Sequence, residues 1–219
     1  MEVTVIDRAA WARREYFEHY LTSVPCTVSM TTQLEIGPLR RSGRRLYPAM
    51  LHLLAQTVNE HGQFRMALRG EELVRYGSMT PYYTVFHKQS GSFSNLWTDY
   101  AEDYGEFLAR FEEDQRRYGA SEGFSPKPGL PENYFTVSML PWRGFTAFQV
   151  NTPDYRYLRP IFTMGRMEES EGSCKLPLAV QVHHAVCDGF HLCAFLDGLQ
   201  QKIDRLAAPP VRPEGRTTP

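Results

Sequence analysis

A histidine and a carboxylate lie four residues apart near the end of this chain of 219 residues, where His184 precedes Asp188 and Gly189 follows the acid. A neutral imidazole can take a proton on one ring nitrogen while a hydrogen bond holds the other nitrogen, which is the task of a general base. In an arbitrary chain, a core histidine near a helix cap is the more common interpretation of this spacing, since such motifs indicate function only statistically. The spacing alone therefore leaves both interpretations open.

The flanking residues predict a strand followed by a helix. Apolar residues alternate over 176–184, with His184 as the last inward side chain and His183 on the other face. Apolar residues over 192–206 fall at helical spacing. Asp188 should therefore lie in the turn or the first helical turn, where an acid is favoured.

The segment PLAVQVHHAVCDGFH (177–191) resembles the active-site segment of the chloramphenicol acetyltransferase family. Other segments resemble that family in the same order: WARREYFEHY (11–20), RRLYPAMLHLLAQTVNEHGQFRMAL (44–68), YYTVFH (82–87), GSFSNLW (91–97), FTVSMLPW (135–142) and PIFTMGR (160–166). The acyltransferases of lipoyl-carrying complexes share the short motif but not YTVFH or SxxPW. The resemblance implies an α/β (α+β) fold, the CoA-dependent acyltransferase sandwich of a mixed β-sheet covered by helices. It implies one domain over 1–208 and leaves 209–219, rich in proline, as an unfolded tail.

The resemblance also implies a chemistry. An acetyl group would pass from acetyl-CoA directly to a primary hydroxyl of chloramphenicol, without an acyl-enzyme, after His184 removes the hydroxyl proton. Ser138 would stabilise the oxyanion of the tetrahedral intermediate, and Thr163 would act there through water. An oxyanion donor is typically worth ~3 kcal/mol. Taken alone, Ser138 is better explained as an ordinary turn serine, and Thr163 by ordinary strand propensity.

Asp188 matches a structural acid of the family that pairs with an arginine of the first helix. Arg13 is the better match because it shares a helical face with Phe17 and Tyr20, and Arg14 is the alternative. The pair would fix the backbone that orients the general base.

The resemblance assigns two further groups of residues. The antibiotic pocket would be lined by Tyr20, Val24, Cys26, Val28, Phe93, Asn95, Phe124, Phe148, Val150 and Tyr157, and the CoA site by Arg45, Tyr47, Trp142 and Arg166. Four residues depart from the usual pattern of the family: Val24, Val28, Asn95 and Met167. The resemblance also implies a homotrimer with its active sites between subunits.

Composition narrows the class of protein. The net charge of −1 with interspersed signs argues against nucleic-acid or membrane partners, and 42% hydrophobic residues allow one large core. Long helical patterns are expected around 9–21, 47–61 and 98–118. No apolar run is long enough to span a bilayer and no signal peptide is recognised, so we expect a cytoplasmic protein with four free thiols.

Alternatives to the leading interpretation remain. The same transfer could serve another small hydroxyl-bearing acceptor, or the chain could be a non-catalytic trimer that binds hydrophobic ligands. Cys187 could be proposed as a nucleophile, but no acid or base arrangement marks it as an activated thiol. A zinc site of nearby histidines and cysteines fits no standard spacing, so no metal is expected.

Overall fold

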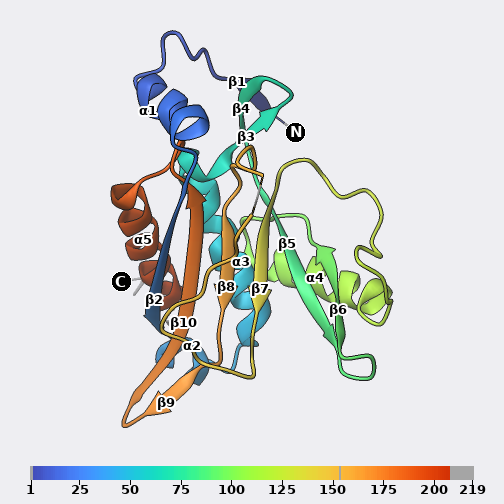
Figure 1. The fold of residues 1–219 in the computed structure, drawn as a ribbon. Helices are drawn as coiled ribbons and strands as arrows, with labels where there is room; N and C mark the ends of the chain where they lie inside the picture. The colour runs from blue at the N-terminus through green and yellow to red at the C-terminus, as the bar shows by residue number, and fades with distance from the viewer. Residues whose placement is uncertain (1, 153, 208–219) are drawn as a thin grey trace, which may run out of the picture.

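The computed structural model describes residues 2–152 and 154–207. A mixed seven-stranded sheet runs in the order β2-β10-β8-β7-β5-β6, with β9 paired to β10 (Figure 1). Its strands are β2 (Thr27–Glu35), β5 (Thr80–His87), β6 (Ser92–Trp97), β7 (Tyr134–Met139), β8 (Ile161–Met164), β9 (Glu168–Ser170) and β10 (Ser173–His183). β7 pairs in parallel with β5 and β8, and the other pairs are antiparallel. This is the mixed sheet that the sequence predicts.

Helices cover one face of this sheet (Figure 1). They are α3 (Leu46–Glu60), α4 (Tyr104–Tyr118) and α5 (Gly189–Ala207), with the short α2 (Gly37–Arg41) at the end where β9 lies. Alternate residues of β10 point into the core beneath the helices, and α5 packs an apolar stripe against them: Leu176, Leu178, Val180 and Val182 from β10, and Leu192, Phe195, Leu199 and Ile203 from α5. The predicted two-layer arrangement is confirmed.

The other face of the sheet carries polar side chains. Ser138 on β7 is the register partner of Thr163 on β8, which in turn pairs with Ala179 on β10. Because their strand neighbours Val137 and Phe162 belong to the core, these residues alternate to the face without helices. The segment after β7 crosses this face, where the backbone N–H of Phe148 donates to Thr31 Oγ1 at 3.4 Å.

The remaining elements lie within residues 3–76. α1 (Arg14–Glu18) continues into a π-helical turn, His19–Ser23. A second sheet of three strands, in the order β1-β4-β3, contains β1 (Val3–Val5), β3 (Met66–Arg69) and β4 (Glu72–Tyr76), and a 3₁₀ turn, Gly62–Arg65, precedes β3. No pattern in the sequence predicts this second sheet.

Helix boundaries differ from expectation at two places. The pattern over 98–118 predicts a helix that begins six residues before α4. The observed helix begins later because Asp103 caps it, accepting the backbone N–H of Glu106 at 2.9 Å. The pattern over 9–21 predicts one continuous helix, but the α-helical part is short and the chain then widens into the π turn. The tail predicted at 209–219 lies outside the described residues. No helix in the described part of the chain is both long enough and apolar enough to cross a membrane.

Candidate active site

His184 lies one residue beyond the end of β10, next to the π turn. Its backbone N–H donates to the carbonyl of Cys26 at 3.0 Å, and its ring stacks on Tyr20 with centroids 3.9 Å apart. The ring Nδ1 lies 3.0 Å from the carbonyl oxygen of Cys187. Because a carbonyl only accepts, Nδ1 carries the proton in this contact and Nε2 keeps a free lone pair. The tautomer is the one that a general base needs.

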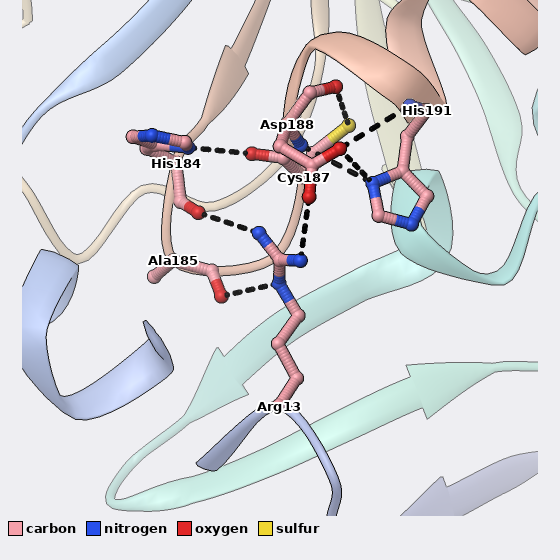
Figure 2. Close-up of polar contacts among 6 residues, drawn as sticks. All are labelled: Arg13, His184, Ala185, Cys187, Asp188 and His191. Atoms are coloured by element: carbon pink, nitrogen blue, oxygen red, sulfur yellow. Dashed lines mark hydrogen bonds and ion pairs between the residues drawn. The ribbon is translucent and has the colours of Figure 1, made fainter. Parts of the chain in front are cut away.

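Arg13 ties together the turn that carries this histidine (Figure 2). Its Nη1 donates to Asp188 Oδ2 at 2.8 Å, while Nη2 donates to the carbonyl of His184 and Nε to that of Ala185, both at 3.2 Å. One guanidinium therefore engages three positions of the turn between β10 and α5. The contact between Arg13 and Asp188 that the sequence predicts is present, and Arg14 instead pairs with the exposed Glu18.

Asp188 sits at the start of α5, as the sequence predicts. Its Oδ1 lies 2.8 Å from Nδ1 of His191 and accepts the backbone N–H of His191 at 3.4 Å. Burial alone would raise the pKa of Asp188, but the hydrogen bonds from Arg13 and His191 outweigh it and lower the pKa. The carboxylate is therefore ionised at neutral pH. Within the described chain no hydrogen bond joins Asp188 to His184, which is the arrangement of a structural acid.

His183 faces the opposite way from His184. It is buried, and its Nδ1 accepts the N–H of Ala185 at 3.1 Å. Burial lowers the pKa of His183, so the ring is neutral at pH 7. This is the geometry of a histidine that shapes the turn.

Cys187 is buried beside Asp188. Burial, reinforced by the negative charge of Asp188, raises the pKa of its thiol to about 12. A thiol that stays protonated is a poor nucleophile. Among the described residues no group of His, Cys, Asp and Glu side chains is arranged to hold a metal ion.

Ser138 lines a cavity of about 660 Å³ on the face of the sheet without helices. The cavity lies over β5, β6 and β7, and the segment after α4 closes one side of it. Its lining includes four residues that the sequence predicts, namely Phe93, Asn95, Phe124 and Trp142, together with Tyr82, Thr84, Phe86, Gly91, Ser92, Leu130, Tyr134, Thr136, Met139 and Leu140. Aromatic walls around a few hydroxyls suit an acceptor with an aryl ring.

His184 does not belong to this cavity. Ser138 is level with Thr163 and Ala179 in the sheet, and His184 follows Ala179 by five residues. At about 3.3 Å per residue, the base lies about 16 Å further along β10. A hydroxyl held beside Ser138 of one chain is therefore out of reach of His184 of the same chain.

The residues predicted to line the antibiotic pocket fall into two groups, one around His184 and one at the cavity beside Ser138. Tyr20 and Cys26 contact His184, and Val28 packs against the core opposite Val182. Val24 is half exposed just after the π turn.

On the cavity side, the hydroxyls of Tyr157 and Thr136 form a hydrogen bond of 3.2 Å. Asn95 is buried, and its amide Nδ2 donates to the carbonyl of Phe124 at 3.1 Å, so this polar group already has a partner. Phe148 and Val150 belong to the segment that crosses the open face.

The predicted CoA residues are not gathered at one point. Tyr47 on α3 donates its hydroxyl to the carbonyl of Thr84 at 2.9 Å, behind the cavity floor, and burial raises its pKa. Arg45 pairs with Glu112 on the surface. Trp142 is exposed and packs edge-on against Phe86. Arg166 is also exposed, and its backbone N–H donates to the carbonyl of Arg143.

Some residues that line the cavity were not predicted, although the alternating pattern of their strands indicates them. Tyr82, Thr84 and Phe86 occupy alternate positions of the segment YYTVFH, which is the period of one strand face. The same holds for Tyr134 and Thr136, which alternate with core residues.

Comparisons with known proteins show the family of the chain. The model of the family described as chloramphenicol acetyltransferase matches residues 1–200. A chloramphenicol acetyltransferase of Clostridium perfringens is 49% identical over 201 residues, covering 91% of this chain and 97% of that protein. One of Campylobacter coli is 46% identical over 207 residues, covering 94% of this chain and all of that protein (100%).

Solved structures share the fold. A structure named chloramphenicol acetyltransferase superposes with a TM-score of 0.80 at 21% identity, covering 92% of this chain and 100% of its own. The dihydrolipoamide acetyltransferase of Azotobacter vinelandii gives a TM-score of 0.63 at 16% identity, covering 88% and 86%. At sequence identities this low, these two structures support the assignment of the fold alone.

Proposed function

Because this chain belongs to the chloramphenicol acetyltransferase family, we propose that it inactivates chloramphenicol by transferring an acetyl group to it from acetyl-CoA. Nε2 of His184 takes the proton of the acceptor hydroxyl, and the hydroxyl oxygen attacks the thioester carbonyl. As the tetrahedral intermediate collapses, the C–S bond breaks and the imidazolium returns the proton to the CoA thiolate. The observation that supports this role is the Nδ1 contact with the carbonyl of Cys187, which leaves Nε2 able to accept a proton.

Arg13 and Asp188 are positioning residues in this scheme. They hold the carbonyls of His184 and Ala185 and the start of α5, and so fix where the imidazole points. Ser138 would donate to the oxyanion from the cavity. Thr163, its buried register partner, would act through a water molecule.

We extend the proposal to a homotrimer with composite active sites. The supporting observation is the separation of about 16 Å along β10 between His184 and the level of Ser138. A ring of three subunits lets His184 of one copy face the cavity of the next copy, and each interface then holds one complete site.

The CoA-binding residues and the location in the cell are also part of the proposal. Trp142 and Arg166 are exposed near the end of β7 and β8, where an extended thioester could reach Ser138, and Arg45 would meet the nucleotide phosphates. No metal has a place in the mechanism. All four cysteines are free, as expected in the reducing cytoplasm.

Two experiments test the proposal. The first incubates the purified chain with acetyl-CoA and chloramphenicol and detects the released CoA thiol. A folded protein that gives no thiol release at saturating substrates contradicts the function.

The second experiment co-expresses His184→Ala and Ser138→Ala subunits, each nearly inactive alone. Random mixing in a cyclic trimer should restore about a quarter of the wild-type sites, because some interfaces combine the intact His184 with the intact Ser138. If the mixture stays as inactive as the separate variants, the composite site is wrong. Co-expression of His184→Ala with His184→Gln is the matched control, because both defects lie on the same side of the interface and no mixed interface regains an intact base.

A further inference from the structure

Lys127 is a largely buried cation outside the residues discussed so far. Its Nζ lies 2.7 Å from Asp114 Oδ1, donates to the carbonyl of Trp97 at 2.9 Å and stands 3.5 Å from the centroid of the Trp97 ring. The side chains of Lys127 and Asp114 are only 13% and 12% exposed. Charges this deep must be paired, so each of the two residues depends on the other.

Asp114 joins this ion pair to the sheet. Its other oxygen, Oδ2, accepts from Thr98 Oγ1 at 2.7 Å. Because Thr98 donates its one hydroxyl proton to Asp114, the hydroxyl of Tyr83, 2.9 Å away, must donate to Thr98. The chain of contacts thus runs from β5 through the residue after β6 to α4 and on to Lys127.

Lys127 belongs to the segment 119–133, which links α4 to β7 without helix or strand. Before Lys127, this segment touches the sheet through two carbonyls. That of Ser121 accepts from Ser94 Oγ at 3.0 Å, and that of Phe124 accepts from the backbone N–H and the side chain of Asn95 at 2.9 and 3.1 Å. Lys127 adds a charged contact three residues beyond Phe124.

The same segment supplies one side of the cavity beside Ser138. Phe124 and Leu130 line the cavity from this segment, on either side of Lys127. Phe124 is 73% exposed, so packing of its own side chain does little to hold it in place. Its position rests on the backbone around it, which is held by the two hydrogen bonds from Asn95 and, three residues further on, by the contacts of Lys127.

We propose that the largely buried ion pair of Lys127 and Asp114 helps to hold the segment that carries Phe124 and thereby sets the affinity for the acceptor. The two residues touch neither reacting group and leave the chemistry at His184 unchanged. This inference rests on the proposed function, because it names the acceptor of that function as the ligand of the cavity.

The test separates binding from turnover in the full-length protein. Lys127→Met removes the ammonium group and keeps most of the side-chain volume. We expect its Kd for chloramphenicol, measured by calorimetry without acetyl-CoA, to rise about tenfold or more, with the KM for chloramphenicol in parallel. The KM for acetyl-CoA and kcat should stay within about twofold. Asp114→Asn should act in the same direction.

Glu113→Gln is the matched control. Glu113 precedes Asp114 on α4, but its pairs with Arg116 and Arg117 are exposed, and such pairs contribute little. It should leave every constant unchanged. Hydrogen exchange gives a readout without ligand: amides of 121–127 should exchange about tenfold faster in Lys127→Met and at the wild-type rate in Glu113→Gln.

The outcomes are decisive in each case. Unchanged chloramphenicol binding in folded Lys127→Met protein overturns the proposal, and so does an equal rise in both Michaelis constants. If Lys127→Met does not fold, Lys127→Arg decides, because it keeps Asp114 paired with a larger planar group: a raised Kd supports the proposal and a wild-type Kd overturns it. A wild-type protein that neither binds nor acetylates chloramphenicol refutes the proposed function. In that case, exchange in 121–127 still supports or refutes this role of the ion pair.

Discussion

Tyr20 stacks on the imidazole of His184 with an interplanar angle of 28° and ring centroids 3.9 Å apart. The contact joins the π turn to the end of β10 and restricts rotation of the His184 ring about its side-chain torsions. Tyr20 therefore contributes to orienting the base in addition to any contact with the acceptor.

Tyr20→Leu should lower kcat/KM by about three- to tenfold, because an aromatic pair contributes ~0.5–1.5 kcal/mol beyond its buried area. Tyr20→Phe keeps the stacked ring and should retain near-wild-type values. Steady-state kinetics on both variants makes the comparison. Equal losses in the two would assign the effect to the hydroxyl group instead of the stack.

His184→Ala should lower turnover by ~10²-fold or more while the fold persists, since general-base catalysis contributes that much. His183→Asn is the matched control, because an amide oxygen can still accept the N–H of Ala185 that His183 Nδ1 accepts now. We expect it to lose much less activity. Circular dichroism confirms folding, and similar losses in the two variants would show that the wrong histidine was chosen.

The contact between Arg13 and Asp188 can be measured by a double-mutant cycle. Arg13→Met and Asp188→Asn should each lower the free energy of unfolding by about 1 to 3 kcal/mol, because hydrogen bonds between charged groups contribute on that scale and both groups are partly buried. The double variant should cost less than the sum of the two. Strict additivity in denaturant unfolding would argue against the pair.

Asp188 should also make stability depend on acid pH. Its pKa is lowered in the folded protein, so its contribution is present above the unfolded carboxyl pKa of about 3.9 and is lost as pH falls through the folded value. The Tm difference between wild type and Asp188→Asn should be steady from about pH 5 to 7 and shrink below about pH 4. A difference that grows with acidification would reverse the assigned sign.

Cys187→Ala should retain turnover, because the thiol is held protonated by a pKa of about 12 and only the backbone carbonyl of this residue contacts His184. Kinetics should be sequential, with both substrates bound before transfer. Mass spectrometry after incubation with acetyl-CoA alone checks this. An acetylated Cys187, or parallel double-reciprocal lines, would indicate a covalent intermediate.

The fold and the contact between Arg13 and Asp188 were predictable from the sequence, whereas the contacts of the turn with main-chain carbonyls were not. Alternation over 176–184 and helical spacing over 192–206 predict β10 and α5, because burial imposes those periods. The contact between Arg13 and Asp188 followed from the resemblance together with helical spacing. The roles of His184, Ser138 and Thr163 remain predictions.

Other features depend on contacts between distant segments that no local pattern encodes. The second sheet brings Val3–Val5 beside Glu72–Tyr76, and three-residue strands leave almost no periodicity to detect. The partner of Asn95 is a carbonyl 29 residues away, and the pair of Lys127 with Asp114 is defined only once the segment 119–133 folds back on α4.

The partner of His184 Nδ1 is a main-chain oxygen, and this has a genetic consequence. No amino-acid exchange at position 187 removes a carbonyl, so the protonation pattern of the base tolerates variation in that side chain. The spacing of the residues is what must be kept. Insertion or deletion of a single residue between His184 and Asp188 would move the carbonyl away from the ring and leave every functional group in the sequence. Because the side chain of Cys187 is buried, screening of random variants should find other small residues at position 187 among active clones, and no length changes in this turn.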